Sequence, residues 1–569
     1  MRTLIEVERT SYDEVPYDSY PFPQSHPNRL ATIARLLGMN PAPLETCRVL
    51  ELGCASGGNL IPMAAAMPQA TFLGIDASKR QIEQGEGTIN DLGLQNIQLL
   101  HLDILNFDEQ FSKSPENGAA NRGTEFDYLI CHGVYSWVPD RVQEQILAIC
   151  AGYLSRQGVA YISYNTNPGW RMRGMIRDVM SYRANFFESP EAQTQEARAL
   201  LDFLAAAVAK ENNPYGLLLN HELEVLRTKA DHYLFHEHLE EHNEPLYFHQ
   251  FMERAAAKQL QYLGEAEYSM MAASNFPPEV ERMVRRLASS SNGDLSQAPI
   301  SNKPRVSEER SRNEDVDIIQ LEQYMDFVRN RMFRQTLLCH GDVQLSRMFA
   351  PERLFGMHVA SPAEPEQPIQ DIHSRESVVF RRPGSSLMTA DPLVKAAMVS
   401  LRAAWPASIL FEDLVTHAVE RLCPGPLLVD ADHFRRDALR VAAPLLNCYA
   451  TGHVDIRYAP VPYSAEIAEH PVACPLARLQ ATQAGAATTR WHGLTRLDDL
   501  ERRLLPLLDG QHNRMDLIET LRADVAAERL VLRDKGGPVS GQERTLQILE
   551  QMIDRQLAEI SRKGLLVAS

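Results

Sequence analysis

The sequence predicts an α/β fold in which a doubly wound domain is followed by mainly helical domains and a winged-helix-like C-terminal region. Short β-branched runs alternate with helical stretches over roughly the first 180 residues, which is typical of a parallel sheet covered by helices. From about residue 186 the apolar pattern is almost wholly helical. In about the last 190 residues, helical stretches precede a short β-branched run, which is the element order of a winged helix.

The doubly wound part is expected to contain five strands separated by helices. The expected strands are Arg48–Leu52, Thr71–Ile75, Ile97–Leu100, Tyr128–Cys131 and Val159–Ser163. The expected helices include Asn59–Met67, Lys79–Leu92 and Arg141–Leu154. A polar, Gly- and Asn-rich stretch, Ser112–Thr124, is predicted to be a surface loop.

Shifts in composition divide the chain into three predicted domains. Residues 1–185 form the doubly wound domain, and residues 370–569 form the winged-helix-like region. Between them, residues 186–345 form a helical domain with a flexible linker at about 288–315, where Ser, Asn, Pro and mixed charges gather. A strongly periodic helix is expected over Ile318–Leu338.

Two winged-helix-like units are expected in the C-terminal region. In the first, Thr389 or Asp391 ahead of Pro392 is a good helix start, and His453–Tyr458 (HVDIRY) is the short strand. A second unit is expected over Asp498–Val567. The region carries nearly balanced charge, which favours a protein-contacting or structural role over reading DNA.

Composition excludes several classes of protein. Of the 569 residues, 44% are hydrophobic and 23% are charged, which excludes a wholly disordered chain, a fibre and a coiled-coil rod. The formal charge is 57 − 74 = −17, which disfavours general nucleic-acid binding. Apolar runs such as Leu60–Met67 are far shorter than the ~20 residues of a membrane helix. Eight cysteines without a CxxC motif, and no apolar leader segment, favour a reduced cytoplasmic protein without membrane insertion.

The strongest motif is ELGCASGGN, from Glu51 to Asn59, which follows one strand and begins a helix. Such a Gly-rich turn lets backbone N–H groups approach a ligand at the edge of the sheet. Asp76 ends the next strand, 76 − 53 = 23 residues after Gly53, where an acid can accept from both ribose hydroxyls. Asp103 follows the third strand. These positions favour an adenosine ligand.

The sequence of the Gly-rich loop indicates which class of adenosine ligand it binds. A dinucleotide favours G-x-G-x-x-G, whereas this loop has Gly53, Ala55 and Gly57 at alternate positions. Glu51 beside a pyrophosphate would be repulsive, but it can face the cationic end of S-adenosylmethionine. The motif therefore favours a methyl donor, with a dinucleotide and a purely structural loop as alternatives.

The segment ELGCASGGN…GID…LDI…FDYLICHGVYSWVPD resembles the class I S-adenosylmethionine-dependent methyltransferases, which have a Rossmann-like fold. One departure is Ala55, which stands where glycine is commoner. The resemblance implies contacts to the donor as follows: Gly53 and Gly57 under the methionine moiety, Glu51 close by, Asp76 at the ribose, Asp103 at the adenine amino group, Ile104 against the ring, and His132 near the donor methyl.

Three further stretches narrow the resemblance: Tyr12–Leu30, Asp231–Tyr268 and Glu322–His340. Together they resemble bacterial methyltransferases that carry a methyltransferase regulatory domain, including protein lysine methyltransferases that act on outer-membrane proteins. This likeness covers about residues 10–345 and is only architectural beyond. It implies N-methylation of lysine side chains in a protein substrate, such as an outer-membrane or surface protein. The alternatives are a small-molecule methyltransferase and a donor-sensing regulatory protein without catalysis.

Candidate acceptor-binding residues follow the fourth and fifth strands, because ligands bind at the carboxyl ends of parallel strands. Aromatic and carbonyl groups there can bind an amine and stabilise a methylated cation. The alternative is that these side chains only pack the loops. The candidates are His132, Tyr135, Trp137, Asn165, Asn167 and Trp170.

Two segments carry weaker hypotheses. The N-terminal tyrosines are candidates for a lid over the donor, with Tyr12 the expected contact; the alternative is an arm packed on the outside of the domain. The stretch His238–His242 (HLEEH) matches the H-x-x-E-H pattern of one zinc-protease group. No distant acidic third ligand accompanies it, so no metal is expected, and the histidines are interpreted as a helix edge and turn.

Overall fold

The computed structural model describes residues 19–112, 125–208, 213–227, 229, 231–240, 242–289, 316–423, 430–461, 467–534, 537–538 and 541–567. The predicted loop at 112–124 and the predicted linker at 288–315 fall almost wholly outside these ranges, as do Tyr12 and Tyr17. None of the helices described is long and apolar enough to cross a membrane.

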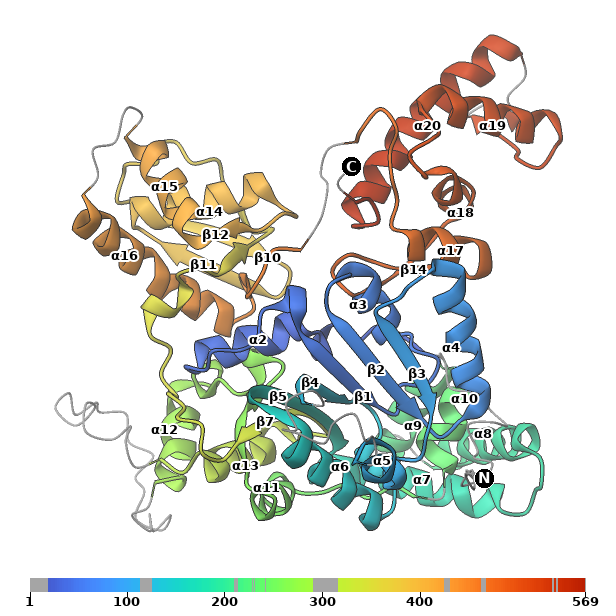
Figure 1. Cartoon of the computed structure of the whole chain (residues 1–569), viewed down its shortest axis with the longest axis vertical. Helices are drawn as coiled ribbons and strands as arrows, with labels where there is room; N and C mark the ends of the chain where they lie inside the picture. The colour runs from blue at the N-terminus through green and yellow to red at the C-terminus, as the bar shows by residue number, and fades with distance from the viewer. Residues whose placement is uncertain are drawn as a thin grey trace.

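A seven-stranded sheet with helices on its faces forms the centre of the molecule (Figure 1). Its strand order is β3-β2-β1-β4-β5-β7-β6; β1 to β5 are parallel, and β7 is antiparallel to both β5 and β6. The strands are β1 Arg48–Leu52, β2 Thr71–Asp76, β3 Ile97–His101, β4 Phe126–Cys131, β5 Leu154–Asn165, β6 Leu260–Glu265 and β7 Phe333–His340. The chain order reverses between β1 and β4, so a ligand crevice is expected at their carboxyl ends.

The buried strands explain why the five predicted strands are confirmed. Successive side chains of a strand point to opposite faces of a sheet. Val49 of β1 accordingly lies in one apolar core and Leu50 in the other, and Tyr128 and Leu129 of β4 divide in the same way. The flanking helices are α2 Pro27–Leu36, α3 Leu60–Ala66, α4 Lys79–Leu92, α5 Phe107–Ser112 and α6 Asp140–Tyr153.

The helix expected over Ile318–Leu338 is wrong in its second half. Helix α13 runs from Ile318 to Arg329, and the following Asn330 takes a left-handed conformation with φ of 49° that ends it. The chain then enters β7 between β5 and β6. A strand buried on both faces shows no clean alternation, so its apolar residues extended the helical pattern. The sheet therefore crosses the predicted domain boundary at residue 185.

A buried ion network joins β6, β7 and α13. The guanidinium of Arg334 contacts three carboxylates whose side chains, like its own, are fully buried. The distances are 2.6 Å from Nη1 to Glu265 Oε1, 3.0 Å from Nη2 to Glu322 Oε2 and 2.8 Å from Nε to Asp326 Oδ2. Arg331 adds a second guanidinium, 2.7 Å from Glu265. The paired charges satisfy one another where water is excluded.

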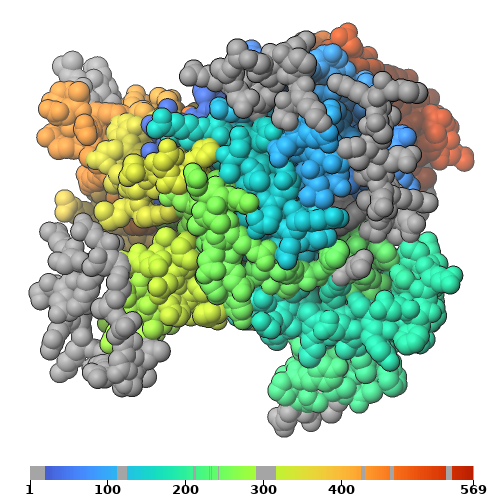
Figure 2. All heavy atoms as spheres, turned by 60° about the horizontal axis from the view of Figure 1, so that its bottom comes forward, coloured from blue at the N-terminus to red at the C-terminus, as the bar shows by residue number. Residues whose placement is uncertain are grey.

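Helices fill the chain between β5 and β7, apart from β6. Several of them share a separate apolar core that includes Ile176, Met180, Leu201 and Leu219. In the space-filling view, part of this region forms a green lobe that projects from the rest of the molecule (Figure 2). The helices are α7 Trp170–Ala184, α8 Pro190–Ala207, α9 Pro214–Arg227, α10 Asp231–Leu234, the π-helix η6 Phe235–Leu239, α11 Phe248–Ala257 and α12 Pro278–Leu287.

The C-terminal region comprises two groups of elements that lie on the same side of the sheet (Figure 1). The first contains β8 His358–Ala360, β9 Glu364–Pro365, β10 Val378–Arg382, β11 Ser385–Thr389, α14 Pro392–Ala404, β12 Ile409–Leu410, α15 Phe411–Leu422, α16 Ala431–Ala450 and β13 Asp455–Arg457. The second contains α17 Pro475–Gln483, β14 Ala486–Thr488, β15 Leu494–Arg496, α18 Asp499–Leu504, α19 Arg514–Ala526, β16 Arg533–Asp534, β17 Gly537–Pro538 and α20 Gln542–Arg562. The predicted order of helices followed by a strand is present in the first group.

Candidate active site

The Gly-rich loop leaves β1 through three residues with positive φ. The values are 73° at Gly53, 50° at Ala55 and 75° at Gly57. A Cβ on Gly53 would lie 2.5 Å from Cγ2 of Val134, so only glycine fits there. Ala55 adopts the left-handed region at a modest cost, and the loop keeps its shape without the commoner glycine.

Asp76, at the end of β2, holds this loop. Its Oδ2 accepts from the Ala55 N–H at 2.8 Å, and its Oδ1 accepts from the Ser78 N–H at 2.8 Å. Asp76, which is predicted to bind the ribose, therefore also stabilises the conformation of the Gly-rich loop.

Glu51 is buried at the end of β1. Its Oε1 accepts from Nδ2 of Asn59 at 2.8 Å, and its Oε2 has no hydrogen-bond partner among the residues described. Burial raises the pKa of Glu51 to about 8; the Asn59 hydrogen bond opposes the rise, and the charge of Asp76 adds to it. An unpartnered buried carboxyl oxygen fits a cationic ligand group such as the amino group of methionine.

Asp103 and Ile104 complete the row of strand ends. Asp103 follows β3 and caps a short 3-10 turn, with its Oδ1 accepting from the Leu105 N–H at 2.8 Å. Ile104 is 9% exposed. Strands β1, β2 and β3 are neighbours in the sheet, so Glu51, Asp76 and Asp103 lie near their carboxyl ends, along one edge of the sheet. This is the arrangement that the sequence predicts for an adenosine ligand.

His132 follows β4 and lies under an N-terminal residue. Its ring stacks on Phe22 with 3.7 Å between the ring centroids, and its Nδ1 lies 2.8 Å from the hydroxyl of Tyr161. Burial lowers the pKa of His132 to about 3, so the ring is neutral. A neutral ring is compatible with a sulfonium nearby.

Two contacts here escaped the sequence analysis. Phe22, left without a role, is tethered because its N–H donates to Oδ1 of Asn59 at 2.9 Å. The same oxygen lies 2.8 Å from Nε2 of His492, in the turn between β14 and β15. No local signal in the sequence links residues this far apart.

The acceptor candidates after β5 carry buried polar atoms without partners. Asn165 is 3% exposed, and its Nδ2 has no partner in the described part of the chain. Asn167 donates from Nδ2 to the Pro245 carbonyl at 2.9 Å, while its Oδ1 is unpartnered. Nε1 of Trp170 is likewise unpartnered, and its ring meets Trp137 edge-on at 6.2 Å between centroids. These polar atoms therefore have no hydrogen-bond partner among the described residues.

The chain at 243–246 crosses the ends of β4 and β5. The Glu244 N–H donates to the Ser136 carbonyl at 2.8 Å, and the Leu246 N–H donates to the Asn165 carbonyl at 3.2 Å. This stretch lies in a segment singled out in the sequence, Asp231–Tyr268. It covers the loops that carry the acceptor candidates.

Tyr135 occupies a different place from the other candidates. It is fully buried, with its ring 5.3 Å edge-on from Phe251 and 6.1 Å from Tyr164, centroid to centroid. A side chain enclosed by these rings packs the core, and the part of Tyr135 in acceptor binding stays a prediction.

The histidine-rich stretch includes a π-helical turn. Nδ1 of His236 lies 2.7 Å from Oε1 of Glu240, and His238 is fully buried. In the ranges that the structure describes, no three His, Cys, Asp or Glu side chains converge as a metal site. His236 therefore shares a local hydrogen bond with Glu240.

Three family models match the chain. One described as a methyltransferase domain matches residues 50–160, and one described as a predicted methyltransferase regulatory domain matches residues 230–298 and 291–340. One described as the PKMT C-terminal winged helix domain matches residues 469–565, which largely coincides with the second expected unit, Asp498–Val567.

Relatives extend the likeness to the whole chain. An uncharacterized protein of Rickettsia prowazekii is 32% identical over 568 residues, which cover 98% of this chain and 94% of the relative. A second uncharacterized protein of that organism is 41% identical over 258 residues, covering 45% of this chain and 98% of the relative. The solved structure of PKMT2 from Rickettsia typhi is 29% identical with a TM-score of 0.80, covering 97% of this chain and 100% of that one.

PKMT2 has also been solved in complex with AdoHcy, with a TM-score of 0.79 to this structure. AdoHcy is the demethylated product of S-adenosylmethionine, and the row of acids, the Gly53 turn and the unpartnered Glu51 oxygen fit that ligand. The methyl donor is S-adenosylmethionine. This chain belongs to the class I S-adenosylmethionine-dependent methyltransferases that carry a methyltransferase regulatory domain and a PKMT-type C-terminal winged helix domain.

Proposed function

We propose that this methyltransferase N-methylates lysine side chains of a protein substrate. The observation that carries the proposal is the set of unpartnered buried polar atoms on Asn165, Asn167 and Trp170 at the carboxyl end of β5. A buried amide oxygen without a partner favours a ligand that donates hydrogen bonds, as an amine does. The likeness to PKMT2, whose abbreviation denotes a protein lysine methyltransferase, supports the same acceptor.

The surroundings suit a polypeptide acceptor. Met172, Met332 and Phe333 are 47%, 43% and 39% exposed, and all three lie close to the loop that carries Asn167 and Trp170. Exposed apolar side chains at the mouth of a site favour contact with a protein. The formal charge of −17 favours the approach of a lysine-bearing segment.

The chain's residues divide the work of the transfer. When bound, S-adenosylmethionine supplies a methyl group on a sulfonium sulfur, and its S–C bond breaks as the new N–C bond forms. Glu51 would hold the donor's amino group, Asp76 the ribose and Asp103 the adenine. Oδ1 of Asn167 would accept a hydrogen bond from the neutral acceptor amine and orient its lone pair. The ammonium proton passes to solvent before attack, because an amine of pKa about 10.4 is otherwise protonated.

Labelled methyl transfer tests the proposal. Purified enzyme, labelled S-adenosylmethionine and cell-envelope proteins should give a labelled polypeptide, and blocking the lysines by acetylation should abolish the label. Asn167→Leu should lower methylation by about tenfold or more without changing donor affinity, because it removes only the acceptor contact. Asn220→Leu, which changes the same residue type on α9, is the matched control.

Other outcomes identify the alternatives. Label in an extractable metabolite, with unlabelled protein, would assign a small-molecule acceptor. Donor binding without any transfer would assign a donor-sensing protein. Equal labelling of acetylated and untreated polypeptide would exclude lysine as the acceptor.

A further inference from the structure

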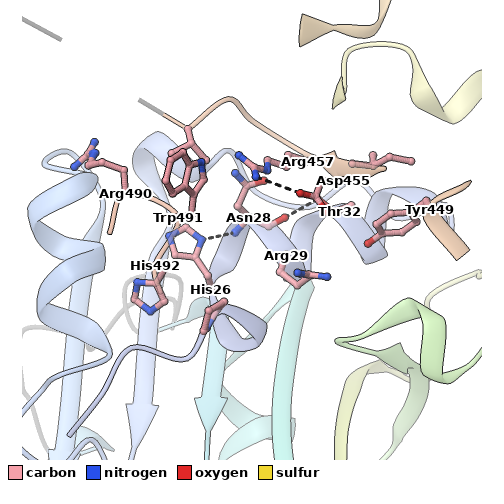
Figure 3. A pocket seen from close by; sticks show the side chains of 13 residues that line it. His26, Asn28, Arg29, Thr32, Tyr449, Asp455, Arg457, Arg490, Trp491 and His492 are labelled. Carbon is pink, nitrogen blue, oxygen red and sulfur yellow. Dashed lines mark hydrogen bonds and ion pairs between the residues drawn. The ribbon is translucent and has the colours of Figure 1, made fainter. Parts of the chain in front are cut away.

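A cavity of about 250 Å³ lies where three distant parts of the chain meet (Figure 3). Its walls come from the start of α2, from β13, and from residues 490–492 between β14 and β15. Its volume is slightly below the ~300 Å³ at which sites for drug-sized ligands begin. The space therefore suits a small metabolite better than a bare ion.

Positive charge dominates the lining. Arg29, Arg457 and Arg490 face one lining carboxylate, Asp455, whose Oδ2 lies 3.7 Å from Nη2 of Arg457. Arg29 also lies 3.6 Å from Glu267, outside the lining. The lining therefore carries three guanidinium groups and one carboxylate. Guanidinium groups are the preferred partners of phosphate oxygens.

The pKa of His26 indicates the sign of the electrostatic potential in the cavity. The pKa of His26 is lowered to about 4, most of all by burial and then by the charges of Arg457, Arg490 and Arg29. Because each of these charges acts in the same direction, the potential at the His26 ring is positive. An anion in the cavity would relieve this unfavourable field.

A second, independent observation points to a ligand. Tyr449 is 6% exposed, and its hydroxyl oxygen accepts from the guanidinium of Arg29, while the hydroxyl proton has no acceptor in the part of the chain described. In Figure 3 this hydroxyl is directed toward Arg29 at one end of the cavity. A buried hydroxyl proton without an acceptor is costly, and an oxyanion oxygen would accept from it.

We propose that this cavity binds a phosphate group, free or as the monoester of a small metabolite, and that its occupancy changes the affinity for the methyl donor. The ligand lies against Arg29, Arg457 and Arg490, with the Tyr449 hydroxyl as a further donor. Trp491 supplies an aromatic wall for the organic part of a monoester.

The coupling to the donor follows a short series of contacts. The His26 ring lies edge-on to His492, with 5.0 Å between the centroids. Nε2 of His492 donates to Oδ1 of Asn59 at 2.8 Å, and Nδ2 of Asn59 donates to Oε1 of Glu51 at 2.8 Å. A ligand that shifts the His26–His492 pair changes how Glu51 is held. By linkage, the donor then changes the phosphate affinity by the same factor.

Calorimetry on the full chain tests the site, with inorganic phosphate and ribose 5-phosphate as probes in phosphate-free buffer. Saturable binding is expected, tighter for the monoester if the natural ligand is a metabolite. Arg457→Gln should weaken both probes by about tenfold or more, because one charge-assisted contact is lost. Arg457→Lys should retain part of the affinity, which separates loss of charge from misfolding. Arg381→Gln, at an exposed guanidinium outside the cavity, should change nothing.

A second titration tests the coupling. The AdoHcy affinity, measured with and without saturating phosphate, should differ severalfold in the wild type and be the same in His492→Phe, which lacks the hydrogen bond to Asn59. Absence of saturable binding of either probe, or equal binding by wild type and Arg457→Gln, would overturn the site. Phosphate binding that leaves the wild-type AdoHcy affinity unchanged would overturn the coupling.

Discussion

His492 and Asn59 are 433 positions apart in the chain, and their side chains share a buried hydrogen bond of 2.8 Å. The Asn59 amide connects three segments, because its Oδ1 also accepts from the Phe22 N–H and its Nδ2 donates to Glu51. The C-terminal winged helix domain thereby reaches the methionine end of the donor site. This arrangement makes Asn59 an organiser of the site.

Asn59→Ala should weaken donor binding by about 1–3 kcal/mol, because it leaves Glu51 and the Phe22 amide without their partner. Calorimetry with AdoHcy measures the loss. Asn220→Ala, which removes an amide that bonds only within α9, should leave the affinity unchanged. Equal affinities for wild type and Asn59→Ala would show that Asn59 does not organise the site.

Asp76→Ala should weaken donor binding by about 1–3 kcal/mol, because the ribose hydroxyls and the Ala55 amide lose their acceptor. Asp127→Ala is the matched control. Asp127 also accepts from a backbone N–H, that of Arg48, but at the opposite end of β1. We expect it to lower the melting temperature without changing AdoHcy affinity; loss of affinity in both variants would remove the ribose assignment.

Donor binding should release a proton near neutral pH. The pKa of Glu51 is raised to about 8, so the ligand-free carboxyl is mostly protonated below that pH. The donor's ammonium group favours the carboxylate, so donor affinity should rise with pH up to about 8. Titrations in buffers of different ionisation enthalpy measure the protons released. Glu51→Gln should abolish the release, and an unchanged count would assign the proton to another group.

The same shift predicts a stability effect in the ligand-free protein. The folded state keeps a proton on Glu51 between its ordinary pKa of 4.5 and about 8, whereas the unfolded chain loses it. The unfolded state binds fewer protons, so this group's contribution to the free energy of unfolding falls as pH rises through that window. Glu51→Gln should therefore raise the melting temperature more above pH 8 than at about pH 5.

Gly53→Ala should disrupt the conformation of the Gly-rich loop and destabilise the protein. Its new Cβ would lie 2.5 Å from Val134, at a φ of 73°. Gly133 has a similar φ of 68° but open space around a Cβ, so Gly133→Ala isolates the conformational cost. We expect Gly53→Ala to destabilise by about 1–3 kcal/mol and Gly133→Ala by less. Adding Val134→Ala should recover part of the loss in Gly53→Ala, as thermal unfolding can show; no recovery would mean that Val134 is not the obstacle.

Arg334→Met should destabilise the protein by about 3–5 kcal/mol, because it leaves buried carboxylates without their main cation. Thermal or denaturant unfolding measures the change. The control is Arg381→Met, whose ion pair with Glu366 is exposed and should contribute little. A small effect at Arg334 would mean that the carboxylates are protonated and need no cation.

Local patterns predicted much of the fold and of the donor site. The five parallel strands have short β-branched sequences, and the acids at the ends of β1, β2 and β3 follow from where each strand stops. The part of Tyr135 in acceptor binding stays a prediction, because an aromatic side chain after a strand is equally compatible with the core. The strand β7 was missed because its largely buried sequence, FRQTLLCH, continues an apolar pattern compatible with a helix.

The contacts that join distant segments escaped prediction for a different reason. His492 shows nothing in its own neighbourhood that indicates Asn59, and Arg334 shows nothing that indicates Glu265. Such pairs depend on how completed elements pack, which a single sequence does not encode locally.

The position of β7 between β5 and β6 has a consequence for how this protein can be divided. Residues 166–332, which include β6, separate β5 along the chain from its second neighbour in the sheet, β7 at Phe333–His340. A fragment truncated at residue 185 would present the twelve-residue β5 as a bare edge, open to pairing with another chain and to aggregation. A fragment that keeps β5 paired on both sides must therefore extend through β7.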